Sequence, residues 1–364
     1  MEPQPMNGGD GPTSYSRNSS HQRAGVSAAT AFIQDGIAEE LELGVALHNN
    51  VYSTVRNSFA IADLGCSVGP NTFLAVEAIL EAVRLKYGPA LPQFHVFFND
   101  QVGNDFNTLF RSLPPDAGYF AAGVAGSFHR RLFPKSSIHF VHSSYSIQWL
   151  SRVPKEVRDR ENSASWNKGR IIYTGAPREV WTAYAAQYAE DLRSFLQARA
   201  EEVVFGGLMA LLFPFSQSGN SSKDSPLSRL FTLLGSTLMD MAKKGHEVEE
   251  EKVDSFNLPI YIPSMTEFKG LVEENGYFSV VRTEALPPPV SSAAKEVFAR
   301  AVSMSMRAGT EGMLSDHFGS QVVDDLFEKY EKKIVDSSGL LEINPTGEAA
   351  ELFVLLKRKT LAIN

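Results

Sequence analysis

The sequence predicts an α/β fold in which a mostly parallel sheet, with helices on both faces, is interrupted by an α-helical cap. Three observations lead to this prediction. Short apolar runs alternate with helical patterns up to residue 214, the first such run ends at a glycine-rich turn, and the alternation stops after Pro214. Alternating strands and helices are typical of parallel sheets, because each crossover packs a helix on one face of the sheet.

The first elements expected are an arm, a helix and a strand–turn–helix unit. Residues 1–20 are rich in Gly, Ser and Asn, which indicates a mobile arm. A helix is expected from about Ala28 to Leu43. The apolar run Phe59–Leu64 predicts a strand that stops at Gly65, and a helical pattern follows over Asn71–Leu85.

Further strands and one long helix complete the first part of the chain. A helix is predicted where apolar residues recur at steps of three and four, at Val180, Tyr184, Tyr188, Leu192 and Phe195. The strands are expected at Phe94–Phe98, Ser137–Tyr145, Arg170–Tyr173 and Gly207–Phe213. The first of them stops at Asn99-Asp100.

The pattern changes after Pro214. A polar stretch, Ser216–Ser225, indicates a loop, and Leu227–Met241 and Ala293–Met313 predict helices. Two late strands, Phe278–Ala285 and Leu352–Lys357, can rejoin the sheet. We therefore divide the chain into an N-terminal arm that closes over the site (1–27), an α/β core (28–214, 264–288 and 346–364) and a helical cap that forms a pocket (215–263 and 289–345).

Composition narrows the classes of function. The formal net charge is −8 and the isoelectric point about 5.6, which argues against a nucleic-acid partner because such proteins need a basic face. A single cysteine, Cys66, excludes an intramolecular disulfide and fits a reducing compartment. The N-terminus lacks the apolar core of a signal peptide, and no run approaches the roughly 18 apolar residues of a membrane span. We expect a soluble, cytoplasmic protein.

The turn DLGCSVG, residues 63–69, is the most informative motif. Small residues at Gly65, Ser67 and Gly69 allow a ligand to approach the backbone at the end of the first strand. Ser67 interrupts the glycine pattern of dinucleotide-binding turns, which disfavours a nicotinamide oxidoreductase. An acidic turn suits a cationic sulfonium, and Asp100, at the end of the next strand, can accept from both hydroxyls of a ribose. The alternative is a structural turn in which Asp100 caps a helix.

Longer motifs resemble the SABATH family of plant S-adenosylmethionine-dependent small-molecule methyltransferases over nearly the whole chain. They are MNGGDGPTSYSRNS, IADLGCSVGPNT, FFNDQVGNDFNTLF, GSFHRRLFP, SSYSIQWLSRVP, NKGRI and DSFNLPIYIPS. Within the family, the chain looks most similar to enzymes that methylate the carboxyl groups of loganic or farnesoic acid. The resemblance implies a Rossmann-like methyltransferase core, S-adenosylmethionine as methyl donor, a small carboxylic acid as substrate and a homodimer.

The resemblance also implies roles for individual residues. The expected contacts to the methyl donor are Tyr15, Cys66, Asn71, Asp100, Gln101, Ser127 and Phe128. The expected contacts to the acid are Gln22, Tyr145, Gln148, Trp149, Leu230, Phe231 and Met306, of which Gln22 and Trp149 donate hydrogen bonds to the carboxylate. Some members hold magnesium, here at Asn167, Asp254, Phe256 and Asn257; such a metal is expected to be structural, and a plain hydrogen-bonded cluster is the alternative.

Two departures from the family pattern leave the substrate open. Gln148 stands where many carboxyl-methylating relatives have His, and Gln occurs there in relatives that methylate xanthine nitrogens. Ala125 replaces the usual Pro before GSF. The alternatives are therefore an N-methyltransferase acting on a xanthine-like ring, or a non-catalytic binding protein on the same scaffold. A carboxylate is ionised at pH 7, so its methylation requires no acid–base residue, and we expect His139 and His142 to be structural.

Overall fold

The computed structural model describes residues 4–42, 58–88, 93–159, 164–217, 225–245, 248–286, 294–337 and 351–360. These residues form one seven-stranded sheet with the strand order β3-β2-β1-β4-β5-β7-β6. The strands are β1 (Ser58–Leu64), β2 (Gln93–Asp100), β3 (Phe120–Ala125), β4 (Ile138–Ser144), β5 (Val203–Pro214), β6 (Phe278–Leu286) and β7 (Glu351–Arg358).

The topology of the sheet identifies where a ligand can bind. This place is formed by the carboxyl ends of the parallel strands and is here called the binding edge. β1 pairs in parallel with both β2 and β4, while β7 runs antiparallel between β5 and β6. From β1 the chain builds outward through β2 and β3, and β4 then starts on the other side of β1. Ligands of open α/β sheets bind beyond the carboxyl ends of the strands at such a reversal.

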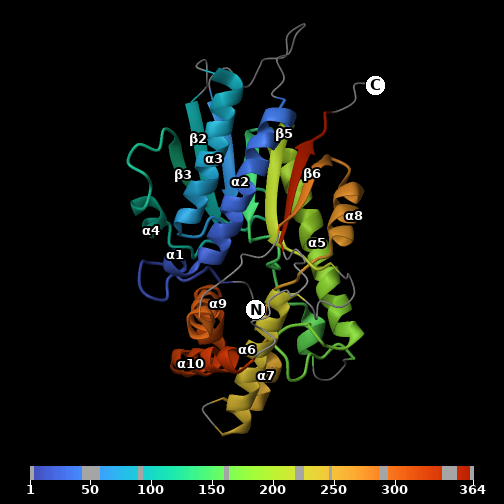
Figure 1. Ribbon diagram of the computed structural model, residues 1–364. Coiled ribbons are helices and arrows are strands. Elements are labelled where there is room, and N and C mark those ends of the chain that lie inside the picture. The colour runs from blue at the N-terminus through green and yellow to red at the C-terminus, as the bar shows by residue number, and fades with distance from the viewer. Residues whose placement is uncertain are drawn as a thin grey trace.

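Helices cover both faces of the sheet. α2 (Ser20–Glu40) and α3 (Pro70–Tyr87) lie on one face, and α5 (Arg178–Glu202) and α8 (Met265–Asn275) lie on the other (Figure 1). Side chains alternate between the faces along each buried strand: Phe353 and Leu355 join the α2–α3 side, whereas Leu352, Val354 and Leu356 join the α5–α8 side. This alternation follows from the two-residue period of a strand, so β7 is apolar at every one of these positions.

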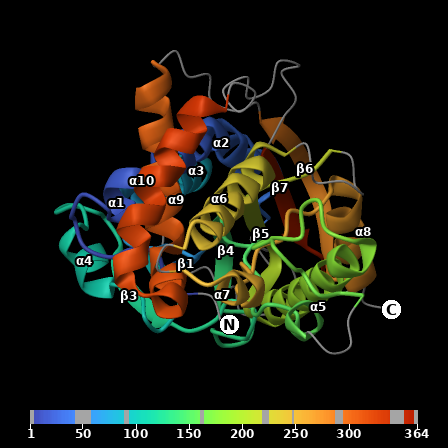
Figure 2. The same cartoon turned by 90° about the horizontal axis from the view of Figure 1, so that it is seen from below.

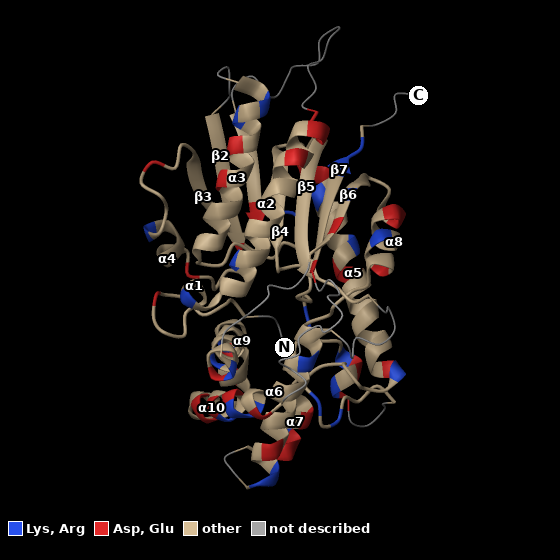
Figure 3. Ribbon diagram, viewed as in Figure 1, with Lys and Arg blue, Asp and Glu red and all other residues tan. Residues whose placement is uncertain are grey.

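A second layer of helices lies beyond the carboxyl ends of the parallel strands. It contains α6 (Pro226–Lys243), α7 (Glu250–Ser255), α9 (Lys295–Phe318) and α10 (Ser320–Asp336), as Figures 1 and 2 show. The shorter elements are α1 (Tyr15–Asn18), α4 (Phe106–Arg111) and a 3-10 helix, η2 (Lys155–Arg158). In the view of Figure 3, Lys and Arg are interspersed with Asp and Glu. None of the described helices combines the length and apolar character needed to cross a bilayer.

One strand predicted from the sequence is absent, and one strand of the structure was not predicted. The run Arg170–Tyr173 is not a strand; it is irregular, and its carbonyl at Ile171 accepts from Leu258 N at 2.8 Å. Its apolar side chains are buried by packing against cap and core residues instead of by pairing in the sheet. The strand β3 was missed; it is an edge strand, FAAGVA, made mostly of small residues, and four of its six residues are exposed.

The N-terminal arm also differs from the prediction. The helix expected from Ala28 already begins at Ser20 and ends at Glu40, while residue 43 lies outside the described residues. The described part of the arm lies against α9, where Asn7 N donates to Ala308 O at 2.9 Å and Asn7 Nδ2 to Glu311. The arm is thus held by specific contacts. Of the predicted polar loop, residues 218–224 lie outside the described residues.

Candidate functional site

The turn after β1 is held in one shape by backbone hydrogen bonds. Gly65 N and Cys66 N both donate to the carbonyl of Asn99, at 2.9 and 3.0 Å. Gly65 has φ +81°, and a Cβ at this position would lie 2.0 Å from Ser146 Oγ. Ser67 also has a positive φ, +50°. Because a side chain at residue 65 would be strained and would also clash, this position requires glycine.

Asp100 ends β2 directly beside this turn. Its Oδ2 accepts from Ser67 N and its Oδ1 accepts from Gln101 N, each at 2.7 Å. Burial raises the pKa of Asp100 to about 6, although the two backbone N–H groups favour the charged form. Each carboxylate oxygen can accept more than one hydrogen bond. The half-buried side chain therefore keeps acceptor capacity for the hydroxyl groups of a ligand.

Asp63, the acidic residue of the DLGCSVG motif, makes structural contacts. Asp63 is buried; Thr72 Oγ1 donates to its Oδ2, and His142 Nδ1 lies 2.6 Å from its Oδ1. The carboxylate thereby links β1 to α3 and β4. His139 Nδ1 accepts from Ala60 N at 3.0 Å, and burial lowers the pKa of this imidazole to about 4. Both histidines thus have the structural setting that the sequence predicted.

The N-terminal segment closes over the turn. Asn71 Nδ2, at the start of α3, donates to both the carbonyl and the hydroxyl of Ser19, at 3.2 and 3.0 Å. Tyr15 lies in the same neighbourhood: burial raises the pKa of its hydroxyl, and the charges of Asp100 and Asp63 raise it further. Gln22 follows in the first turn of α2. Segments far apart in the sequence therefore converge here.

Several buried polar atoms around this turn have no hydrogen-bond partner in the part of the chain that the structure describes. Buried polar atoms in folded proteins are nearly always paired, so a group of exceptions calls for an explanation. In the turn, just after it or bonded to it are Ser67 Oγ, Asn71 Oδ1 and Asn104 Oδ1, and further such atoms are Gln22 Oε1 in α2 and Gln148 Oε1 in the segment after β4. A polar ligand beside Asp100 would supply their missing partners. Cys66 is buried as well, and burial raises the pKa of its thiol.

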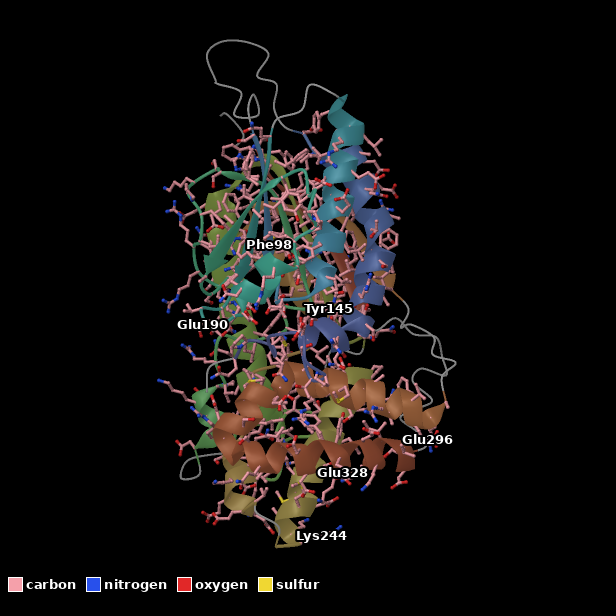
Figure 4. The ribbon with its side chains drawn as sticks, turned by 90° about the vertical axis from the view of Figure 1, so that its left-hand side faces the viewer. Phe98, Tyr145, Glu190, Lys244, Glu296 and Glu328 are labelled. Carbon is pink, nitrogen blue, oxygen red and sulfur yellow. The ribbon has the colours of Figure 1, made fainter. Side chains whose placement is uncertain are left out.

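The segment after β4 forms the next wall. Tyr145 has φ +55°, and its N–H donates to Leu212 O at 2.7 Å. Gln148 Nε2 donates to Tyr145 O at 2.7 Å. Figure 4 shows Tyr145 where the sheet layer meets the helices of the second layer. A non-glycine residue held at positive φ stores strain, which is characteristic of functional sites.

The backbone around Trp149 is held by contacts with residues 259–261. Trp149 N donates to Ser146 O at 2.9 Å, and the residue forms an isolated antiparallel bridge with Ile260. The neighbouring backbone adds two bonds: Leu150 N donates to Pro259 O at 2.7 Å, and Tyr261 N donates to Gln148 O at 2.9 Å. The half-buried indole is thus placed by a rigid backbone.

The residues after β3 form a third segment at the same edge. Ala125 pairs with Asp100 in the β2–β3 register, and Gly126 N donates to Asp100 O at 2.9 Å. Ser127 is exposed, whereas Phe128 is half-buried and meets Phe195 edge-on, with ring centroids 6.1 Å apart. The departure at Ala125 therefore lies directly beside Asp100.

Comparison with known proteins identifies the family. The family of SAM dependent carboxyl methyltransferases matches residues 1–359. The chain belongs to this family. The family is described by methyl transfer from S-adenosylmethionine, and the chain has the Rossmann-like core that the sequence predicted.

Individual relatives agree with this assignment. The loganic acid O-methyltransferase of Catharanthus roseus is 45% identical over 362 residues, covering 99% of this chain and 95% of the relative. A solved structure of loganic acid methyltransferase with S-adenosylhomocysteine has a TM-score of 0.89 at 44% identity and covers 99% of this chain and 100% of that one. From Arabidopsis thaliana, a farnesoic acid carboxyl-O-methyltransferase is 42% identical (77% and 78% covered) and paraxanthine methyltransferase 2 is 39% identical (90% and 91% covered).

In this carboxyl methyltransferase the expected pocket residues of the cap lie on two helices. Leu230 and Phe231 belong to α6, and Met306 belongs to α9. Phe231 and Met306 are buried, and Leu230 is half-buried; all three pack with the cluster that includes the α5 side of the sheet. The hydroxyl of Tyr330 in α10 donates to the carbonyl of Leu230 at 3.1 Å, and this bond connects α10 to α6.

The residues expected at a magnesium site are hydrogen-bonded to one another or to backbone. Asn167 Nδ2 donates to Asn257 Oδ1 at 2.7 Å, and Gly169 N donates to Asp254 Oδ1 at 2.7 Å. Phe256, whose carbonyl was the fourth expected ligand, is fully buried beside them. Within the described ranges, no group of three or more His, Cys, Asp or Glu side chains is arranged to hold a metal. These contacts include the hydrogen bonds of the structural alternative, and Asn167 Oδ1 is buried without a partner in the described chain.

One acidic residue at the binding edge was not predicted from the sequence. Glu351 begins β7 and is buried, with its Oε1 2.7 Å from His21 Nε2. The Tyr145 hydroxyl and Glu351 Oε2 both crowd Gly25 of α2, where an added Cβ would lie 1.9 and 2.8 Å from them. No signal in the sequence marks this position, because only the antiparallel direction of β7 brings its first residue to the binding edge.

Proposed function

We propose that this family member transfers the methyl group of S-adenosylmethionine to the carboxylate of a small terpenoid or aromatic plant acid, forming the methyl ester. The observation that carries the proposal is the position of Asp100 at the end of β2, where it accepts from Ser67 N in a turn whose Ser67 Oγ is buried without a partner in the described chain. A carboxylate with free lone pairs suits the two hydroxyls of a ribose. The names of the relatives, loganic acid and farnesoic acid methyltransferases, support an acid acceptor.

The contacts to the methyl donor are proposed as the resemblance implied. Asp100 binds the ribose, and the positive φ values at Gly65 and Ser67 let the backbone approach the donor. Phe128 lies beside the strand end that carries Asp100, so its ring can stack on the adenine. The remaining contacts in this proposal are Tyr15, Cys66, Asn71, Gln101 and Ser127.

The acid lies between the N-terminal arm, the segment after β4 and the cap. Gln22 and Trp149 donate N–H groups to the carboxylate, and Tyr145, Leu230, Phe231 and Met306 line the rest of the pocket. Gln148 uses one N–H for Tyr145 O and retains a second N–H and an unpartnered Oε1. Neutral donors suit this task, because a fixed cation would hold the carboxylate tightly and reduce its nucleophilicity.

The mechanism is direct displacement. The substrate carboxylate oxygen forms a bond to the methyl carbon, the carbon–sulfur bond breaks, and its electron pair remains on the sulfur. No proton is transferred, because the acid is already ionised near neutral pH. The protein's part is to hold the oxygen, methyl and sulfur in line, and orientation of this kind can supply about 7–11 kcal/mol. Gln22 and Trp149 orient the oxygen, while Asp100 fixes the donor.

A second candidate is N-methylation of a xanthine-like ring. Gln148 Oε1 is a buried acceptor without a partner, and a ring N–H could donate to it. The similarity to paraxanthine methyltransferase 2 supports the same reading. A third candidate is a non-catalytic small-molecule binding protein on the same scaffold, and failure of the chain to bind the methyl donor would support it.

A panel of acceptors separates these candidates. The purified chain is incubated with radiolabelled S-adenosylmethionine and either terpenoid acids, aromatic acids or xanthines. Label transferred to an acid as a base-labile ester supports the proposal. Transfer only to xanthines supports the N-methyltransferase, and a chain that neither binds the donor nor transfers label supports the binding protein.

Three further features belong to the proposal. The Asn167–Asn257 cluster is a structural support, and magnesium binding there is tested by calorimetric titration with Mg²⁺. We propose a homodimer, to be measured by light scattering of the purified chain. We also propose a cytoplasmic location, to be tested by imaging a fluorescent fusion in plant cells.

A further inference from the structure

We propose that the buried ion pair between Arg199 and Glu202 positions residues 126–133, here called the cofactor loop, and thereby sets the affinity for the methyl donor. The inference rests on the proposed function, in which Ser127 and Phe128 of this loop contact the donor. Both side chains of the pair are fully buried at the C-terminal end of α5. Within the described residues, their side-chain hydrogen bonds go to this loop and to each other, so we infer that they act through the loop.

Arg199 binds the first half of the cofactor loop. Its Nη1 donates to Phe128 O at 2.8 Å, and its Nη2 donates to Arg130 O at 3.0 Å. Its Nε donates to Glu202 Oε2 at 2.7 Å, and its Nη2 also lies 2.6 Å from that oxygen. The planar guanidinium therefore fixes two loop carbonyls and the carboxylate at the same time, which a lysine could not do.

Glu202 binds the second half of the loop. Its Oε1 accepts from Leu132 N and, at 2.9 Å, from Phe133 N. One ion pair thus binds four backbone groups within six residues of chain that contain neither helix nor strand. Charge-assisted hydrogen bonds in a buried setting are stronger and more directional than neutral bonds.

The opposite end of the loop is tied to the binding edge of the sheet. Gly126 N donates to Asp100 O at 2.9 Å, and Asn99 Nδ2 donates to Val124 O and Gly126 O at 2.7 and 2.9 Å. Phe128 lies between the two anchors and packs on Phe195 of α5. The loop therefore spans from the strand that carries Asp100 to the helix that carries the ion pair.

The energetics of a buried ion pair indicate that Arg199 and Glu202 contribute mainly by positioning the cofactor loop. Removing two charges from water is costly, and apolar residues of similar volume often give equal or greater stability. An apolar pair would leave the four loop groups without partners and free to move. The specific contribution of Arg199 and Glu202 is therefore the direction of the loop backbone, which places Ser127 and Phe128 before the donor arrives.

The test measures S-adenosylhomocysteine affinity by calorimetry, with the thermal midpoint recorded alongside. We expect Arg199→Lys and Glu202→Ala to weaken binding about tenfold or more, the change that corresponds to losing one strong hydrogen bond. The double variant Arg199→Met, Glu202→Leu is expected to fold and to show the same loss. The matched control is Arg193→Gln, which breaks an exposed ion pair with Glu274 on the same helix and should change affinity less than about twofold.

Kinetics supply the second measurement. A positioning role raises KM for S-adenosylmethionine while kcat stays within about threefold, because the acid-binding residues are unchanged. The proposal is overturned if the folded double variant binds S-adenosylhomocysteine as tightly as the wild type, or if the variants lower only the thermal midpoint. The variants Phe128→Ala and Ser127→Ala distinguish a failure of the proposed role of the loop from a failure of the ion-pair inference. If they leave affinity unchanged, the proposed role of the loop fails; if they weaken it while the Arg199 variants do not, only the ion-pair inference fails.

Discussion

The side-chain nitrogen of Gln148 lies 2.7 Å from the backbone carbonyl oxygen of Tyr145 and donates a hydrogen bond to it. Because the carbonyl can only accept, this contact fixes which end of the amide is nitrogen. Gln148 Oε1 is then left buried without a partner in the described chain. The residue that departs from many carboxyl-methylating relatives is thus both a support for the strained Tyr145 and an acceptor at the proposed acid site.

Gln148→Glu is expected to lower kcat/KM for acids at least about tenfold, the loss that follows when a paired buried group loses its donor. Glutamate cannot donate to Tyr145 O, and its charge repels the substrate carboxylate. Gln148→His retains an N–H donor and should preserve or improve activity on acids. The measurement is steady-state transfer of labelled methyl groups. If the wild type methylates only xanthines and Gln148→His abolishes that activity, the carboxylate assignment is wrong.

Affinity for S-adenosylhomocysteine should fall as the pH is lowered through about 6, the raised pKa of Asp100 in the free protein. Ribose hydroxyls bind the charged carboxylate, so binding is complete above this pKa and is lost as the group is protonated. The sign for folding is opposite: the raised pKa means that Asp100 costs stability above about pH 6 and that this cost disappears as pH falls toward its ordinary value.

Calorimetry of Asp100→Asn at several pH values checks this prediction. The variant should bind S-adenosylhomocysteine about 10- to 150-fold more weakly, since a charged acceptor is worth about 1.5–3 kcal/mol. Its affinity should show no inflection near pH 6. An unchanged affinity in Asp100→Asn would remove Asp100 from the proposed ribose contacts.

Trp149→Phe is expected to reduce kcat/KM for acids by roughly 10- to 100-fold. Phenylalanine keeps most of the packing but deletes the indole N–H, which leaves one carboxylate oxygen partly unpaired in a closed pocket. The bridge between Trp149 and Ile260 is made by backbone and should persist. Affinity for S-adenosylhomocysteine serves as the control and should not change. Equal losses for acid turnover and donor binding would indicate a packing role instead.

Gly65→Ala should abolish donor binding and lower the thermal midpoint. The added Cβ would lie 2.0 Å from Ser146 Oγ, and the residue would keep an unfavourable positive φ. Gly175→Ala is the matched control, because Gly175 has φ +70° with nothing within 4 Å of an added Cβ. The control should lose only about 1–2 kcal/mol of stability and retain binding. Normal S-adenosylhomocysteine binding by Gly65→Ala would contradict the rigid-turn argument.

Asn167→Ala is expected to lower the thermal midpoint without changing kcat/KM in proportion. The substitution leaves Asn257 Oδ1 without its 2.7 Å donor, and an unpaired buried group costs about 1–3 kcal/mol. A chelator should leave turnover unchanged, because direct displacement needs no Lewis acid. If chelation abolishes turnover while the thermal midpoint stays constant, the structural assignment of this cluster fails.

The sequence by itself determined the elements whose signals are local. The buried strand before Gly65, the small residues of the turn and the Asp at the end of β2 each follow from a short pattern, because strand period and positive φ act within a few residues. The amphipathic spacing at Val180, Tyr184 and Tyr188 likewise predicted α5. Family membership was evident from motifs distributed over the chain and agrees with the family match.

Tertiary structure decided the features that depend on neighbours far along the chain. Arg170–Tyr173 has the composition of a strand but finds no pairing partner, since β4 and β5 already adjoin each other. Glu351 reaches the binding edge because β7 runs antiparallel, and the Arg199–Glu202 pair contacts the cofactor loop because helix packing brings the C-terminal end of α5 against it. The cost of desolvating this buried pair is offset in part by four backbone groups of the cofactor loop, which lie 69 to 71 residues away along the chain, and no local pattern encodes that separation.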